Sequence, residues 1–229
     1  RQKPFIKLPK ILMVGLAGLA FLFTITVGSA RIAGEKSAKQ ALDGYMSRNT
    51  RQMQVFSEKA EGTFFEMDIY NNPMAYFQGL AVLTSGGPKP SKKALLSGTK
   101  AFERALEIHP NHMLSLNQLA QIKRIQGDIA GASILYSKVL EMSPRNTSAA
   151  LKLMEVERTR GNIYAALDAL KKLDQKYTPQ NLPGLGPEAT KTLVAFAEES
   201  NPRPASRKLH SELQKVPVGR MWQVWTTNR

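Results

Sequence analysis

The amino-acid sequence predicts an all-α protein, in which a transmembrane helix precedes a short α-solenoid. Two observations lead to this fold class. The first is an uncharged, apolar stretch of twenty residues, from 11 to 30. The second is a pattern with a period of 34 residues in the middle of the chain. A period of this length is typical of solenoids, in which helical pairs stack on one another.

Composition narrows the classes of function. The chain has 229 residues, a formal net charge of +14, a hydrophobic fraction of 42% and no Cys. About 200 residues outside the apolar stretch suffice for one or two domains with a core. The lack of Cys excludes disulfides and thiolate chemistry. Basic residues are spread along the chain, which disfavours nucleic-acid binding and fits contact with anionic lipid or acidic proteins.

Residues 11–30 are predicted to cross a membrane. Twenty helical residues, at about 1.5 Å each, span a hydrocarbon core of about 30 Å. A cleaved signal peptide is the alternative, because Gly28 and Ala30 are small residues at −3 and −1 of a cut after Ala30. The apolar run is longer than the usual signal-peptide core of about 7–15 residues, which favours a retained anchor.

The flanking charges predict the orientation of this anchor. Residues 1–10 carry four Lys or Arg and no acidic residue, whereas Arg31, Lys36 and Lys39 follow the anchor with acidic residues among them. The positive-inside rule therefore favours a cytoplasmic flank at 1–10 and a non-cytoplasmic domain. In a Gram-negative bacterium this arrangement is a single-pass inner-membrane protein with a periplasmic domain.

Small residues line one face of the predicted anchor. Ala20, Thr24 and Gly28 are four residues apart and share a helix face. Such a face allows two transmembrane helices to approach closely. The face is predicted either to pack on an intramembrane partner or to contact lipid.

Residues 31–70 are predicted to form a helical stalk or linker. Leu42, Tyr45, Met46, Met53 and Phe56 recur at mostly helical steps, which indicates one or two amphipathic helices. An apolar patch at 64–70 follows. This segment either packs on the next domain or holds that domain away from the membrane.

Residues 71–179 carry the repeat. The residues that recur 34 positions apart include Pro110 and Pro144, Phe102 and Tyr136, Leu119 and Leu153, Gly127 and Gly161, Asp128 and Asn162, and Ala132 and Ala166. The chemistry predicts helix–turn–helix units: Gly127 adopts the left-handed conformation that ends a helix, Asp128 caps the next helix, and Pro144 terminates it.

These residues resemble the tetratricopeptide repeat (TPR) pattern, over about three repeats from Asn72 to Thr178. The matching residues are Leu119, Ala120, Gly127, Asp128, Ala132, Tyr136 and Pro144, and then Leu153, Gly161, Asn162 and Ala166. The resemblance implies a concave groove, lined by the first helix of each pair, that binds peptides or partner proteins.

The outward positions of the first helices are the predicted partner-binding residues. They are Asn117, Gln121, Arg124, Lys152, Glu155 and Arg158. Arg and Lys in such a groove bind carboxylates well. The alternative is that these residues form an ordinary solvated helix face.

Residues 180–229 are predicted to hold capping helices and a tail with Trp222 and Trp225. Trp is favoured at membrane interfaces and at binding hot spots. Docking of the tail on a partner or membrane, folding back onto the solenoid, and disorder remain open.

No catalytic motif is present, and His109 and His112 flank a polar turn at a repeat boundary. We therefore expect no enzymatic activity, no metal and no cofactor. The sequence predicts a membrane-anchored scaffold or assembly subunit that docks partner proteins of a larger membrane complex. The alternative function is a transient peptide-binding adaptor or chaperone-like receptor, of the kind used in protein import or cytochrome maturation. A mitochondrial outer-membrane receptor fits less well, because a basic domain matches basic targeting peptides poorly.

Overall fold

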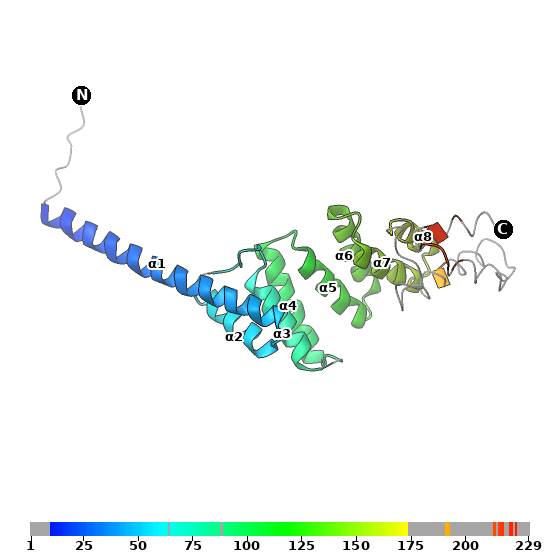
Figure 1. The fold of residues 1–229 in the computed structure, drawn as a ribbon, viewed down its shortest axis with the longest axis horizontal. Coiled ribbons are helices and arrows are strands. Elements are labelled where there is room, and N and C mark those ends of the chain that lie inside the picture. The colour runs from blue at the N-terminus through cyan, green and yellow to red at the C-terminus, as the bar shows by residue number, and fades with distance from the viewer. Residues whose placement is uncertain are drawn as a thin grey trace, which may run out of the picture. The chain divides into compact units, whose positions relative to one another are not determined.

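The computed structural model describes residues 10–63, 65–87, 89–173, 191–192, 213, 215–217, 220–221 and 223. Across these residues the chain is all-helical, apart from a bridge between Met67 and Pro73, which confirms the predicted fold class. The helices are α1 (Lys10–Met46), α2 (Thr50–Glu61), α3 (Met74–Ser85), α4 (Lys92–Ile108), α5 (Met113–Ile125), α6 (Ile129–Met142), α7 (Thr147–Thr159) and α8 (Ile163–Lys171) (Figure 1). Trp222, Trp225 and most of the predicted capping segment lie outside the described residues.

The helices belong to two compact units, which are described separately. Unit 1 is Arg1–Ile108 and contains α1 to α4, and unit 2 is His109–Arg229 and contains α5 to α8. The division falls within residues 71–179, which the repeat had predicted as one continuous segment.

Helix α1 is longer than the predicted anchor. It is one helix of 37 residues, in which the apolar stretch continues into the segment predicted as a stalk. Residues 31–46 include three Ala and two Lys and contain no Pro, so no proline interrupts the helix between the two parts. By length and composition α1 can cross a membrane, and its apolar window is unburied. Figure 1 shows this part extending away from α2 to α4.

The C-terminal part of α1 packs closely on α2. Asn49 ends the intervening turn and caps α2 by accepting a hydrogen bond from Gln52 N at 3.0 Å. The α1 residues that face α2 and the following loop are small and buried: Gly34, Ser37, Ala38, Ala41 and Gly44. A Cβ atom on Gly44 would lie 2.7 Å from Met53 N, and one on Gly34 would lie 2.6 Å from Phe65 Cβ. Residues 31–63 therefore fold as part of unit 1.

Aromatic rings form the core of unit 1. The Tyr76 ring of α3 contacts three other rings: Tyr45 of α1, Phe77 of α3 and Phe102 of α4. The ring centroids are 5.5–6.3 Å apart. Burial, reinforced by Tyr45, raises the pKa of the Tyr76 hydroxyl above its usual range. Gly79 allows this contact, because a Cβ there would lie 2.7 Å from the Phe102 ring. The cluster ties the C-terminal part of α1 to α3 and α4.

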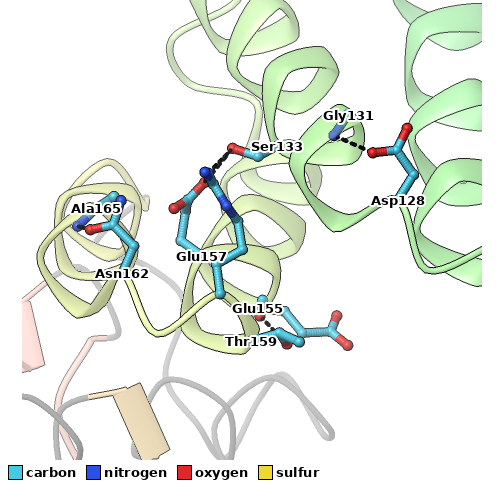
Figure 2. A network of polar contacts seen from close by, with 9 residues as sticks. Asp128, Gly131, Ser133, Glu155, Glu157, Thr159, Asn162 and Ala165 are labelled. Carbon is cyan, nitrogen blue, oxygen red and sulfur yellow. Dashed lines mark hydrogen bonds and ion pairs between the residues drawn. The ribbon is translucent and has the colours of Figure 1, made fainter.

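The helices described in unit 2 form the pairs α5/α6 and α7/α8, whose turns follow the predicted chemistry. Gly127 and Gly161 have φ of 85° and 75°, the left-handed conformation that a helix end requires. Asp128 accepts a hydrogen bond from Gly131 N at 2.8 Å, and Asn162 accepts one from Ala165 N at 3.4 Å (Figure 2). The Lys123 ammonium and the Gly131 N–H lower the pKa of the Asp128 carboxyl. The predicted helix termini are therefore confirmed.

We predict that Gly44→Leu destabilises unit 1. The new side chain would force the backbones of α1 and α2 apart, and overpacking of this kind costs about 1–3 kcal/mol. Thermal unfolding of the full chain in mild detergent, followed by circular dichroism, measures the effect. Gly15→Leu is the matched control, because Gly15 lies in the same helix with no heavy atom within 4 Å of its Cβ position. Equal unfolding temperatures for the two variants would contradict the close contact.

Candidate protein-interaction surface

The six predicted groove residues form two stripes in unit 2. Asn117, Gln121 and Arg124 lie on one face of α5, the first helix of the first pair. Lys152, Glu155 and Arg158 lie on one face of α7, the first helix of the second pair. All six side chains are half-buried, so each stripe follows the border between the helical core and solvent.

An ion pair joins the two stripes. Arg124 Nη1 lies 2.9 Å from Glu155 Oε1, and the two side chains are about one third exposed. Side chains of α5 and α7 therefore reach one another on this surface, although α6 separates the two helices in the sequence. Exposed pairs of this kind contribute about 0–1 kcal/mol to stability. The pairing changes the predicted surface, because the charge of Arg124 is already balanced by a carboxylate.

Tyr136 lies beneath this ion pair. Its ring comes from α6 and is fully buried, and the hydroxyl has no hydrogen-bond partner among the described residues. Burial raises the pKa of Tyr136 to about 12, while Arg124 lowers the pKa and Glu155 raises it. The phenol is therefore neutral at physiological pH, and its ring is part of the buried core of unit 2.

A second polar contact, which the sequence did not predict, joins α6 to α7. Glu157 is buried and accepts hydrogen bonds from Ser133 of α6 and, at 2.8 Å, from Arg160 Nη1. Figure 2 shows the side chains of Ser133 and Glu157 between the two helices. Glu157 follows the apolar Val156 and lies four residues after Leu153, so a charged residue within the buried face of α7 was the available signal. The contact fixes α7 against α6 and has a structural role.

The predicted membrane face of α1 is uncovered in the described part of the chain. Ala20 and Thr24 are exposed, and no heavy atom lies within 4 Å of the Cβ position of Gly28. The Thr24 hydroxyl donates to the Ala20 carbonyl at 2.8 Å, which satisfies its hydrogen-bonding requirement within the helix. The face is thus smooth and apolar.

Unit 1 also has two grooves that the sequence did not predict. Both lie between α1 and residues 63–70, which connect α2 to α3. The first, of about 680 Å³, is lined by Thr26, Val27, Ala30, Arg31, Thr63, Phe65, Glu66 and Met67. The second, of about 570 Å³, is lined by Ile32, Glu35, Lys36, Ala38, Lys39, Leu42, Asp43, Phe65, Asp68, Ile69 and Tyr70. The sequence indicated an apolar patch here but not its position against α1.

The described residues contain no cluster of three or more His, Cys, Asp or Glu side chains that could hold a metal ion. His112 caps α5, since its Nδ1 accepts a hydrogen bond from Ser115 N at 3.3 Å. This histidine therefore has a structural explanation at the start of a helix.

Comparisons with known proteins identify the fold. No protein-family model matches this chain. An uncharacterized protein of Pyropia yezoensis, ycf37, is 36% identical over 59 residues, which make up 26% of this chain and a third (33%) of that protein. The solved structure of MamA from MSR-1 is 18% identical with a TM-score of 0.50, and it covers 86% of this chain and 98% of its own. MamA from AMB-1 is 20% identical with a TM-score of 0.51, over 84% and 99%.

At these identities the likeness to MamA concerns the fold alone, and it agrees with the predicted TPR-like helical solenoid.

We predict that Tyr136→Phe removes a loss of stability at high pH. The phenol deprotonates near pH 10.0 in the unfolded chain but near pH 12 in the folded one. The folded state therefore binds more protons between these values, so Tyr136 contributes full stability below pH 10 and loses it as the pH rises toward 12. The unfolding temperatures of the unmodified chain and of Tyr136→Phe are measured from pH 9 to 12. Tyr76 is present in both, so their difference isolates Tyr136, and a difference that does not change with pH would refute the prediction.

Proposed function

We propose that this protein is a membrane-anchored scaffold that docks partner proteins of a larger membrane complex. Helix α1 carries the proposal, because one continuous helix contains both the uncovered apolar segment and the part buried in unit 1. Because α1 is continuous, no flexible linker separates the apolar segment from the part that packs in unit 1. The bilayer would therefore fix the place of unit 1, as suits a permanent subunit more than an adaptor that captures peptides transiently.

The orientation follows from the flanking charges. The basic flank at 1–10 lies in the cytoplasm, and the part of unit 1 that follows the anchor lies on the other side of the membrane, as does unit 2. In a Gram-negative cell this places the protein in the inner membrane, with residues 31–108 and unit 2 in the periplasm. Partners then include the bilayer itself and other membrane or periplasmic proteins.

The surface on α5 and α7 is the proposed docking site for a protein partner. Its stripes combine amide groups, the Arg124–Glu155 pair and the additional positive charges of Lys152 and Arg158. Because the pair offers both a donor and an acceptor, the surface suits a partner of mixed polarity rather than a plain cluster of carboxylates. The mixed charge of this surface refines the sequence-based prediction that its Arg and Lys residues bind carboxylates.

The small-residue face of α1 is the proposed intramembrane contact. Ala20, Thr24 and Gly28 present little side-chain bulk, so a partner helix can approach the backbone. Contacts by this face and by the surface on α5 and α7 would add to one another, because the anchor holds both at high effective concentration near the partner.

We predict that the full chain, purified through a tag in mild detergent, retains a stoichiometric set of membrane proteins. Replacing Ala20, Thr24 and Gly28 together with Leu is expected to lower the recovery of this set several-fold, because the bulk would separate the helices. Quantitative mass spectrometry of the purified material measures the recovery.

Gly15→Leu is the control for this experiment, since Gly15 lies on the face of α1 opposite Thr24. It should leave the recovery unchanged. A lone monomer from the unmodified chain would contradict the subunit function. An unaffected complex from the triple variant would show that the small-residue face contacts lipid.

We predict that Lys152→Glu weakens partner recovery through the surface on α5 and α7. The change reverses a charge one helical turn from Glu155 and makes this part of the surface acidic. Lys172→Glu, at the exposed end of α8, introduces the same charge change away from the stripes. Membrane localisation and unfolding temperature should match between the two variants. Equal partner recovery would exclude Lys152 from the docking site.

A further inference from the structure

The connection between α2 and α3 presents apolar side chains to solvent in an ordered turn. Asp68 is buried, and its Oδ1 accepts hydrogen bonds from Tyr70 N and Asn72 N, both at 2.8 Å. These bonds hold Ile69 and Tyr70 at the tip of the turn, where 71% and 67% of their surfaces are exposed. The turn therefore fixes in place two large side chains that gain nothing from contact with water.

The same connection lies beside the end of the apolar stretch of α1. Phe65 packs against Gly34, and Phe65 and Met67 line the first groove together with Thr26, Val27 and Ala30. Thr26 precedes Ala30 by four residues, which is about 6 Å along a helix. Residues 65–67 thus lie alongside the last turn of the segment that enters the bilayer and the first turn beyond it.

Apolar exposure continues on the other side of the connection. Ile32 is 70% exposed and lines the second groove with Ile69 and Tyr70. It is two residues beyond Ala30, or about 3 Å along the helix. The exposure of Ile32 is explained if this side chain lies next to the membrane. Tyr70 would suit the same place, because Tyr is favoured at the level of the lipid headgroups.

We propose that residues 65–70 form a second membrane contact, in which Met67, Ile69 and Tyr70, together with Ile32, dock into the interface of the bilayer that α1 crosses. The inference rests on the proposed membrane anchoring of α1. It assigns to unit 1 a lipid-facing side that begins where the anchor ends. The two grooves are the spaces between this connection and α1 that lipid chains and headgroups fill.

The charges around the grooves indicate what kind of lipid surface is contacted. The lining residues include three basic side chains, Arg31, Lys36 and Lys39, and four acidic ones, Glu35, Asp43, Glu66 and Asp68. Since the two signs nearly balance, the contact depends on apolar insertion and not on anionic headgroups. Vesicles of zwitterionic phosphatidylcholine therefore suffice for binding.

The lack of Cys in the chain permits a direct test with single-cysteine variants. Met67→Cys and Ile69→Cys of the full chain are labelled with an environment-sensitive fluorophore and reconstituted into phosphatidylcholine nanodiscs, which leave both membrane faces accessible. Quenching by aqueous iodide and by lipids with a nitroxide at a shallow acyl position is then measured. Leu96→Cys on α4 is the matched control, because Leu96 is also a largely exposed apolar residue of unit 1.

We expect iodide to quench the labels at 67 and 69 several-fold less than the label at 96, and the nitroxide lipid to quench them several-fold more. The same iodide quenching at all three positions would overturn the proposal. Labels at 67 and 69 that become shielded only when co-purifying proteins are added, without quenching by the lipid, would overturn it in favour of a protein occupant.

A label at Leu19→Cys separates this inference from the proposed function. Leu19 is exposed near the middle of the apolar stretch of α1, so quenching there by a lipid with a nitroxide near the end of its acyl chain reports membrane insertion of the anchor itself. No quenching at 19 would defeat the anchoring proposal. Quenching at 19 without quenching at 67 and 69 would defeat the second contact alone.

Discussion

The close contact between the C-terminal part of α1 and α2 is the interaction on which the arrangement of unit 1 depends. Because Ala38, Ala41 and Gly44 bring little bulk, the two helices approach closely, and at Gly44 a Cβ atom would no longer fit. Gly34 allows the same close approach to Phe65, which follows α2. Through this contact the C-terminal part of α1 becomes a structural element of unit 1. The aromatic cluster around Tyr76 then connects the same helix to α3 and α4.

Unit 2 uses a different balance of forces. Its helical pairs are joined by turns whose polar groups are satisfied locally by Asp128 and Asn162, and its core contains larger residues such as Leu116, Tyr136 and Met154. Two polar contacts between helices, Arg124–Glu155 and Ser133–Glu157, cross the apolar packing. One lies at the surface that we assign to partners, and the other is buried and stabilises the stacking of α7 on α6.

The features that were predicted from sequence depend on local chemistry. A left-handed glycine, a capping oxygen and an apolar stretch each act within a few residues, so Gly127, Asp128 and the apolar helix at 11–30 are recognisable without a structure. The Arg124–Glu155 pair joins residues that are 31 positions apart, and the position of Met67 beside Val27 depends on the return of the chain through α2. Both follow from packing between helices, which the sequence pattern does not specify. The small residues of α1 were also hard to interpret, since Gly lowers helix propensity while here it permits close contact.

If α1 spans the membrane as we propose, its continuity determines how the bilayer acts on the protein. Its 37 residues form a rod of about 55 Å. A span whose apolar length differs from the local bilayer thickness adjusts by tilting. In α1 such a tilt turns the C-terminal part of the helix by the same angle, and α2 to α4 turn with it. Bilayer thickness thereby becomes a mechanical input that sets the angle at which unit 1 faces the membrane surface.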